Sequence, residues 1–400
     1  MSSQFDKPPD RAGTGSFKWQ IYGPDVLPLW VADMDFAAPP AVVAAVRRRA
    51  EHGVYGYSVV PQSLAAAIVE HLAGRHCWQI EPEWLVYLPG VVPALNLACR
   101  AFADAGEAVM TVMPVYPPFL QAPPNQDRRL ISVPAVLESG RWRLPLEQME
   151  AALTPDTRLL LFCHPHNPLG RAYSGEEVAA VADFCCRHDL VLCSDEIHCD
   201  LLLDDMRHVP AALAVADAVA ASAANGVATA TTANNAAART VTLMSPSKTY
   251  NLPGLHFAYA VISDAALRQR FKAAAAGLLP MPGPFATVAA EAAYRAGDDW
   301  LAELLAYLRD NAALVEGFVA DSLPGVRMTH VEATYLAWLD VRDACRAAGL
   351  SDAHKACLRA GVALSDGAAF GTPGFLRLNF GCPRRTLEEG LRRLQLALQV

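Results

Sequence analysis

Short apolar runs alternate with helix-like segments through about residue 285 of the chain. The runs are rich in β-branched and aliphatic residues without polar alternation, which is typical of strands covered on both faces. They lie at residues 86–88, 108–113, 158–163, 190–194, 241–244 and 257–262. Helical patterns at 93–105 and 176–188 fall between them. This order predicts βαβ units and a mainly parallel sheet.

The pattern changes after about residue 284, where longer helical segments separate fewer strands. The elements predicted there are helices 285–296, 299–320, 351–360 and 384–398 and strands 334–339 and 375–380. A helix at 39–53 leads from an N-terminal arm into the first region. We therefore expect a large domain over 50–285, and a small α+β domain made by 286–400 together with the arm, 1–49.

Residues 216–239 interrupt the pattern, because they are almost all Ala, Thr, Ser and Asn and have no apolar periodicity. This composition predicts a surface insertion, helical in its Ala-rich first half and mobile in the remainder. We expect no functional residue within it.

Composition and charge exclude several classes of protein. Hydrophobic residues make up 53% of the chain and charged residues 18%, which is too apolar for a disordered chain. The net charge of −8 argues against a nucleic-acid surface, which must be basic. There is no apolar run of about 18 residues to span a membrane. A polar N-terminus and ten dispersed cysteines without a Cys-x-x-Cys pair indicate a reducing, cytoplasmic protein.

Candidate chemistry is concentrated at the ends of the predicted strands. In an open α/β sheet, ligands bind outside the carboxyl ends of the strands. Lys248, in Ser245-Pro-Ser-Lys248, directly follows the strand 241–244. A lysine in that place can form an imine with an aldehyde cofactor if its pKa is lowered. Taken alone, a surface lysine after a strand is the more common case.

Asp195 and His198 follow the strand 190–194. A carboxylate at this edge can keep a pyridine nitrogen protonated, so that the ring draws electrons from an attached carbon. Capping of the next segment is the alternative use of Asp195, and His198 could reach the same ring. Zinc bound by His198 with His164 or His166 is a weaker alternative, because no third ligand has a defined spacing.

Asn167 stands in a proline-rich turn after the strand 158–163. Its amide can donate to a phenolate or carboxylate oxygen, although Asn is also common in turns for local reasons. Gly90 marks a strand-to-helix junction, and the free N–H groups that follow it suit a phosphate. A single glycine at such a junction is a weak signal.

Tyr116 follows the strand 108–113 and offers an aromatic face for a flat ring, or for core packing. Arg377 lies inside an alternating strand, where it needs a substrate carboxylate or an internal ion pair as partner. Each single signal is ambiguous. Their joint occurrence predicts one ligand site, because five polar or turn positions follow five strands: Gly90, Tyr116, Asn167, Asp195 and Lys248.

The order of Asn-Pro, Asp, Ser-x-Ser-Lys and a late Arg resembles the pyridoxal-phosphate enzymes of aminotransferase class I/II, fold type I. Within that family the chain is similar to the MalY/PatB group of cystathionine β-lyases from about residue 17 to its C-terminus. The motifs that carry the likeness are Lys18-Trp19, Val31-Ala-Asp-Met-Asp-Phe36, His52-Gly-Val-Tyr-Gly-Tyr-Ser58, Gly90-Val-Val-Pro-Ala-Leu95, Pro114-Val-Tyr-Pro-Pro-Phe119, Pro165-His-Asn-Pro168, Ser194-Asp-Glu-Ile-His198, Ser245-Pro-Ser-Lys-Thr-Tyr-Asn251 and Arg377-Leu-Asn379. It implies a mostly parallel seven-stranded sheet sandwiched by helices, plus a small α+β domain.

The resemblance also implies roles for individual residues. Lys248 would bind the cofactor aldehyde, Asp195 would pair with the pyridine nitrogen, and Asn167 would bond the ring oxygen. The remaining cofactor contacts would come from Tyr116 and His198 at the ring and from Gly90, Val91, Val92, Ser245 and Ser247 at the phosphate. Substrate would be bound by Arg377, Asp33 and Asn167, and no metal is expected. Tyr57 would reach the phosphate of a neighbouring subunit, which implies a homodimer.

The implied activity is β-elimination on cystathionine or a similar β-thioether amino acid, giving a thiol, pyruvate and ammonia. An aminotransferase shares the early steps and stays an alternative, followed by a non-catalytic regulator on the same fold. A nicotinamide oxidoreductase is disfavoured, because no Gly-x-Gly-x-x-Gly follows a strand. Three features depart from the familiar pattern: His198, where most fold-type-I enzymes have Tyr, His256, and the insertion at 216–239.

Overall fold

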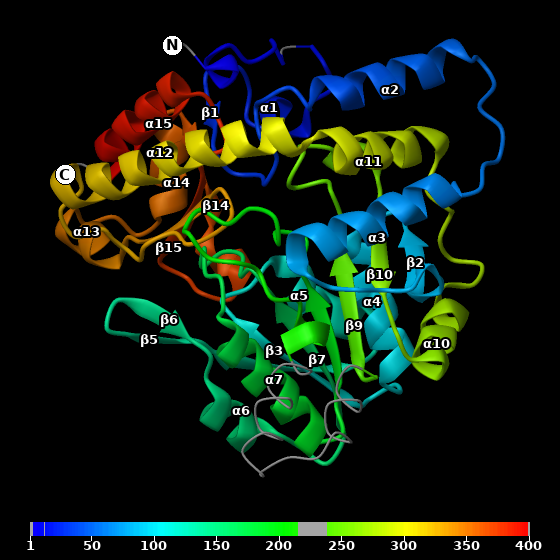
Figure 1. The fold of residues 1–400 in the computed structure, drawn as a ribbon. Helices are drawn as coiled ribbons and strands as arrows, with labels where there is room; N and C mark the ends of the chain where they lie inside the picture. The colour runs from blue at the N-terminus through cyan, green and yellow to red at the C-terminus, as the bar shows by residue number, and fades with distance from the viewer. Residues whose placement is uncertain (1–2, 12, 215–237, 399–400) are drawn as a thin grey trace.

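The computed structural model describes residues 3–11, 13–214 and 238–398, and its centre is a seven-stranded sheet (Figure 1). The strands lie in the order β2-β10-β9-β8-β7-β3-β4. Their bounds are β2 (Leu85–Leu88), β3 (Ala108–Met113), β4 (Arg129–Pro134), β7 (Thr157–Cys163), β8 (Val191–Asp195), β9 (Thr240–Met244) and β10 (Ala258–Val261). The predicted mostly parallel sheet is confirmed, with β10 alone running antiparallel to both of its neighbours.

Helices cover both faces of this sheet, as the non-alternating strands predict. Leu161 of β7 packs in one apolar cluster with Leu95 of α4 (Val91–Phe102) and with α10 (Ala265–Ala275). The neighbouring Leu160 faces the other way and packs with α7 (Gly175–Arg187). Successive side chains of a strand point to opposite faces, so both layers are built from the same short apolar runs.

The C-terminal region, whose predicted domain boundary at residue 286 stays a prediction, combines helices with a second, antiparallel sheet. It begins with α11 (Pro284–Ala296) and the long helix α12 (Asp298–Ser322), drawn in yellow-green to yellow in Figure 1. A four-stranded antiparallel sheet follows, in the order β11-β12-β15-β14. Its elements are β11 (Arg327–Met328), β12 (Leu336–Asp340), α13 (Arg342–Ala347), α14 (Ala353–Arg359), β14 (Ser365–Asp366), β15 (Phe375–Asn379) and α15 (Arg384–Leu398).

The N-terminal arm is attached to this C-terminal region. The short strand β1 (Leu27–Pro28) pairs in parallel with β13 (Val362–Ala363), which lies more than 300 residues later. The helix α2 (Pro40–Glu51) then packs along α11 (Figure 1). From α2 the chain passes to α3 (Gln62–His76), which packs near the β2–β10 edge of the seven-stranded sheet.

Several elements differ from the sequence-based prediction. The helix expected at 93–105 begins at Val91 and ends at Phe102. The elements that the prediction missed include α3, whose many alanines blur its apolar face, α5 (Pro117–Asn125), which has two prolines in its interior, α10, and the edge strand β4. Most of the insertion at 216–239 lies outside the described residues. Within the described ranges, no helix is both long and apolar enough to cross a membrane.

Candidate functional site

The carboxyl ends of the parallel strands open onto a cavity of about 480 Å³. Ten of the residues proposed from the sequence line it, which are Gly90, Val91, Val92, Tyr116, Asn167, Asp195, His198, Ser245, Ser247 and Lys248. They lie at or just beyond the carboxyl ends of five strands, β2, β3, β7, β8 and β9, because the carboxyl ends of parallel strands share one edge. The structure therefore brings together residues spread over more than 150 positions of sequence.

Lys248 lies at the floor of this cavity, four residues beyond the end of β9. Its Nζ donates a hydrogen bond of 2.6 Å to the carbonyl oxygen of Ala32, which comes from the N-terminal arm. Burial lowers the pKa of Lys248 to about 8, against the opposing effect of the Asp33 and Asp195 carboxylates. A lysine with such a pKa carries a substantial fraction of free amine at neutral to mildly alkaline pH, as a nucleophile or base requires.

Asp195 is the last residue of β8 and is almost entirely buried. Its Oδ1 accepts the backbone N–H of Ile197 at 3.1 Å. Burial raises the pKa of Asp195 to about 7, and the adjacent Glu196 acts in the same direction. A cationic group in the cavity would lower the pKa of this buried carboxyl again, because a nearby positive charge favours the ionised form.

Asn167 connects the cavity to Arg377 on β15. Arg377 Nη1 donates to Asn167 Oδ1 at 3.0 Å, and Nη2 donates to the carbonyl of Trp30 at 2.7 Å. The Nε of Arg377 is buried and has no hydrogen-bond partner among the described residues. Burial lowers the pKa of this guanidinium to about 10, so it remains a cation that lacks a carboxylate partner. An anionic substrate group is a natural partner for it.

The other end of the cavity is suited to an anion. Gly90 is the N-cap of α4, so the first backbone N–H groups of that helix face the cavity from Val91 and Val92. Ser247 N donates to Ser245 Oγ at 3.0 Å, and the two hydroxyl oxygens lie 2.8 Å apart. A helix N-terminus flanked by hydroxyl groups is a recurrent phosphate site.

These groups fit pyridoxal phosphate in chemical kind. The cavity offers a lysine amine for an aldehyde, a buried carboxylate for a ring nitrogen, and a helix N-terminus for a phosphate. Asn167 and Tyr116 add an amide and an aromatic ring, and the two are linked by a backbone hydrogen bond of 3.1 Å from Tyr116 N to Asn167 O. Asp195 is the one acidic residue among the described residues that line the cavity, and its carboxylate would face the ring nitrogen and not the phosphate.

Two lining histidines differ in their surroundings. His198 is buried, its Nδ1 lacks a partner within the described part of the chain, and burial lowers its pKa to about 3. His256 is exposed and lies next to Phe257, whose carbonyl accepts from Ser245 Oγ at 2.6 Å. No role was predicted for His256, or for the lining residues Ala32 and Cys163. His256 could have been found from the sequence, because it follows a Pro-Gly pair and lies eight residues after Lys248.

Three predicted site residues do not line the cavity, namely Arg377, which contacts it through Asn167, Tyr57 and Asp33. Tyr57 projects fully into solvent from the segment between α2 and α3. Asp33 is absent from the cavity lining; its Oδ2 accepts from Arg11 Nη2 at 3.0 Å, and its Oδ1 is buried with no hydrogen-bond partner among the described residues. The structure thus places Tyr57 where a neighbouring molecule could reach it, and places Asp33 in an ionic cluster behind Lys248.

The zinc set considered from the sequence is not assembled. Both ring nitrogens of His166 have partners, Tyr173 Oη at 2.9 Å and the Pro114 carbonyl at 2.8 Å. Among the described residues, one group has metal-ligand spacing, formed by His71, His76 and Asp200. The Asp200 carboxylate in that group already pairs with Arg75 at 2.9 Å and accepts from Thr249 at 3.4 Å, so hydrogen bonds account for it.

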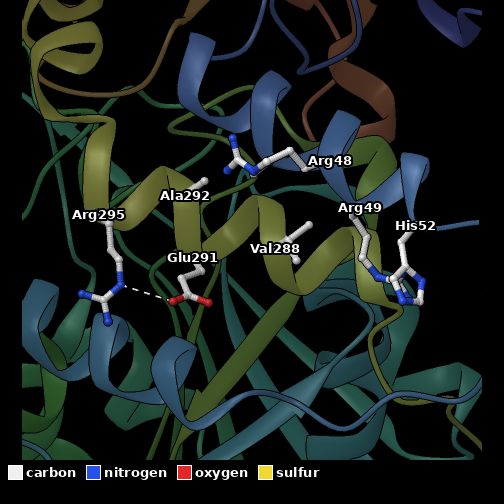
Figure 2. Close-up of a pocket in the computed structure, with 8 residues that line it drawn as sticks. Arg48, Arg49, His52, Val288, Glu291, Ala292 and Arg295 are labelled. Carbon is white, nitrogen blue, oxygen red and sulfur yellow. Dashed lines mark hydrogen bonds and ion pairs between the residues drawn. The ribbon is translucent and has the colours of Figure 1, made fainter.

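A larger cavity, of about 600 Å³, lies elsewhere, between α2 and α11 (Figure 2). Arg48, Arg49 and His52 border it from α2 and its C-terminal end, and Glu291 pairs with Arg295 on α11 at 3.3 Å. None of the residues proposed from the sequence lines it. Volume alone therefore does not identify the functional site, whereas the convergence of polar strand ends does.

Comparisons with known proteins show which family the chain belongs to. The model of the family "Aminotransferase class I and II" matches residues 24–394. Cystathionine beta-lyase PatB of Bacillus subtilis is 37% identical, over 98% of this chain and 99% of its own length. Protein MalY of Escherichia coli is 31% identical, over 99% of this chain and 98% of its own length.

Two solved structures extend the comparison. The crystal structure of OvoB superposes with a TM-score of 0.90 and 41% identity, covering 98% of both chains. The pyridoxal-phosphate-bound C–S lyase from Staphylococcus hominis superposes with a TM-score of 0.89 and 29% identity, covering 100% of this chain and 98% of that one. These findings confirm the resemblance to the MalY/PatB group. The chain belongs to the aminotransferase class I and II family.

Proposed function

We propose that this protein is a pyridoxal-phosphate-dependent carbon–sulfur β-lyase that acts on cystathionine or a similar β-thioether amino acid. The observation that carries the proposal is the shared cavity of the Lys248 amine, the Asp195 carboxylate and the Asn167 amide. Relatives named cystathionine beta-lyase match almost the whole chain, which supports the choice of reaction.

Pyridoxal phosphate, when bound, supplies an electron-withdrawing ring that makes the Cα proton of an attached amino acid acidic. Asp195 supports that function by holding a negative charge beside the ring nitrogen. Asn167 would offer its amide N–H groups to the ring oxygen, and Tyr116 would cover the ring face. Val91 and Val92 would donate their backbone N–H groups to the phosphate.

Lys248 moves the proton. Its amine, with a pKa lowered to about 8 by burial, takes the proton from Cα in the free-base form. Proton transfer by a positioned side chain accelerates such a step by about 10²–10⁴-fold. The Cβ–S bond then breaks and the sulfur leaves as a thiol. With one water, cystathionine is thereby converted to homocysteine, pyruvate and ammonia.

Arg377 orients the substrate. Its guanidinium is buried and cationic, lacks a carboxylate partner in the described structure, and lies 3.0 Å from Asn167 Oδ1. A substrate α-carboxylate placed there would be held by a charge-assisted contact. This fixes the direction of the Cα–H bond relative to Lys248, which is the geometric requirement for proton abstraction.

The test is the release of pyruvate from L-cystathionine by purified protein loaded with pyridoxal phosphate, with no keto acid added. We expect pyruvate, ammonia and a free thiol in equal amounts. Turnover that requires a keto-acid acceptor, with no thiol released, would instead establish an aminotransferase. The second outcome has support from a 29% identical relative named arginine–pyruvate transaminase, of Pseudomonas aeruginosa. Cofactor binding without either reaction would indicate a regulatory protein.

We further propose a homodimer in which Tyr57 contacts the cofactor phosphate of the neighbouring subunit. Apolar side chains cluster on the segment that carries Tyr57, where Val54, Tyr55 and Val59 are also exposed. An exposed apolar group of this size on one segment is typical of an interface. Sedimentation at micromolar concentration measures the mass, and Tyr57→Phe should weaken cofactor affinity only in the dimer.

We assign the protein to the cytoplasm. All ten cysteines lie among the described residues, and all are free thiols. Free, mostly buried thiols are usual in a reducing compartment and rare in secreted proteins. Cell fractionation with an antibody to the protein would test this assignment.

A further inference from the structure

One short stretch of the N-terminal arm contacts two residues of the proposed site. We call residues 30–36 the bridging segment. Its Trp30 carbonyl accepts from Arg377 Nη2 at 2.7 Å, and its Ala32 carbonyl accepts from Lys248 Nζ at 2.6 Å. The position of this backbone therefore affects the group proposed to bind the substrate carboxylate and the group proposed to move the proton.

The bridging segment has no helix or strand of its own to hold it. Side chains from distant parts of the chain bond its backbone instead. Asn379 Nδ2 donates to the carbonyls of Val31 at 2.6 Å and Asp33 at 2.7 Å. Asn251 Oδ1 accepts from Met34 N at 3.0 Å, and its Nδ2 donates to the Met34 carbonyl at 2.9 Å.

A buried ionic cluster fixes the far side of the segment. Lys18 Nζ donates to Asp35 Oδ2 at 2.9 Å and to the Asp33 carbonyl at 3.1 Å. Arg11 pairs with Asp33 at 3.0 Å and with Asp35 at 2.8 Å. The Lys18 side chain is 0% exposed and the Asp35 side chain 3%. Two cations and two carboxylates thus balance one another, with Lys18 and Asp35 buried and the Arg11 and Asp33 side chains 21% and 20% exposed.

Such a cluster contributes little net stability, because desolvation of the charges offsets most of their attraction. The cluster instead fixes the position of the bridging segment. Each ion holds its partner at hydrogen-bond distance, and hydrogen bonds are directional, so the cluster favours one placement of the backbone. Lys18 is decisive here, since its Nζ bonds both the backbone and a side chain of the bridging segment.

We propose that Lys18, acting with Asp35, is a positioning residue that holds the bridging segment so that the Trp30 and Ala32 carbonyls keep Arg377 and Lys248 in place. The inference rests on the roles proposed for Arg377 and Lys248 above. Lys18 itself does not line the cofactor cavity. Its effect on the reaction is exerted through the backbone.

The test compares Lys18→Met with Lys18→Arg, and uses Arg393→Gln as matched control. Arg393 likewise bonds a carboxylate, Glu389 at 2.7 Å, and backbone carbonyls, of Asp25 at 2.9 Å and Gly361 at 2.6 Å, and none of these partners lies in residues 30–36. The first readout is amide hydrogen exchange of the bridging segment in cofactor-free protein. The second is kcat and KM of the loaded enzyme.

In Lys18→Met we expect exchange at Met34 and Asp35 to speed up at least tenfold. We also expect kcat to fall and KM to rise, lowering kcat/KM by about 10–100-fold, as misplacement by about 1 Å does. Lys18→Arg should recover most of both constants, because it restores the charge and the donors. Arg393→Gln should leave exchange in residues 30–36 and both constants within twofold of the wild type.

A folded Lys18→Met protein with wild-type exchange in residues 30–36, or with unchanged kcat and KM, would overturn the proposal. If Lys18→Met does not fold, Asp35→Asn removes the same ion pair with almost no change in volume and must give the same pattern. Should the wild type release no pyruvate, the proposed function fails. The exchange measurement, together with the rate at which Lys248 of cofactor-free protein captures pyridoxal phosphate, then still tests the positioning role.

Discussion

Arg377 Nη1 donates a hydrogen bond of 3.0 Å to Oδ1 of Asn167, joining β15 of the small sheet to the loop after β7 of the large one. Because Oδ1 accepts from Arg377, the amide nitrogen of Asn167 is left to donate into the cavity. That is the polarity needed to bond a ring oxygen. The contact therefore couples the proposed substrate-binding residue to a proposed cofactor-binding residue across the two sheets.

Replacing Lys248 with alanine should abolish turnover, because the amine that takes the Cα proton is lost. We expect kcat to fall by at least 10³-fold, within the range that general acid–base groups contribute. Borohydride treatment of the loaded wild type should also attach the cofactor to Lys248, as peptide mass spectrometry would detect. Labelling elsewhere in the wild type, or steady-state activity in the variant, would remove Lys248 from the mechanism.

Cofactor capture should depend on pH in a way that reports the Lys248 amine. The pKa is lowered to about 8 by burial, so only the free base formed as pH rises can attack the aldehyde. The capture rate of cofactor-free protein should rise about tenfold per pH unit below pH 8 and level off above it. Stopped-flow absorbance measures this rate. A rise that continues to pH 10 would mean an unperturbed lysine.

Arg377→Ala should chiefly raise KM for the amino-acid substrate, because the site for the α-carboxylate is lost. We expect an increase of at least tenfold, with a smaller change in kcat. Arg377→Lys should recover only part of the affinity, since an ammonium cannot donate to Asn167, Trp30 and a carboxylate in the planar arrangement of a guanidinium. Equal KM values for wild type and Arg377→Ala would assign the residue a structural role.

Asp195→Asn should change the pH dependence of stability in cofactor-free protein. The pKa of Asp195 is raised to about 7 by burial, above the unfolded value, so its ionised form destabilises the fold at higher pH. The variant should exceed the wild type by up to about 4 kcal/mol above pH 7. This advantage should shrink as pH falls from 7 and vanish near pH 4. Urea unfolding measures it, with the exposed Asp183→Asn as control.

Two glycines should respond oppositely to alanine. A Cβ at Gly317, within α12, would meet nothing within 4 Å, whereas one at Gly367 would lie 2.5 Å from the Thr372 carbonyl oxygen and 2.6 Å from that of Phe375. Gly317→Ala should stabilise the protein by about 0.5–1 kcal/mol through helix propensity. Gly367→Ala should destabilise it by about 1–3 kcal/mol through overpacking. Urea midpoints compare the two directly, and a stabilised Gly367→Ala would contradict the close approach.

Some parts of the fold were invisible to sequence patterns for physical reasons. The helix α3 is rich in alanine, so its buried Leu64, Ile68 and Leu72 do not stand out from its other faces. The edge strand β4 is partly exposed and begins with an arginine, which weakens its apolar signal. Long-range packing stabilises both elements, and a local window does not contain that information.

The sequence by itself determined the strands, the alternation with helices and the polar residue that follows each strand. These properties are local: a buried strand needs an apolar run, and the carboxyl edge of a parallel sheet gathers whatever comes next. Lys248, Asp195 and Asn167 were found in this way, and the cavity contains all three.

Only the tertiary structure decided which backbone lies against those side chains. Nothing near Lys248 in sequence indicates that its amine bonds the carbonyl of Ala32, 216 residues earlier, or that the neighbouring Asp33 pairs with Arg11. Such contacts depend on how the arm folds back over the molecule. The path of the arm is set by ion pairs and by amide side chains whose partners are far apart in the chain. Contacts between distant residues do not produce a periodic pattern in the sequence, so they could not be predicted from it.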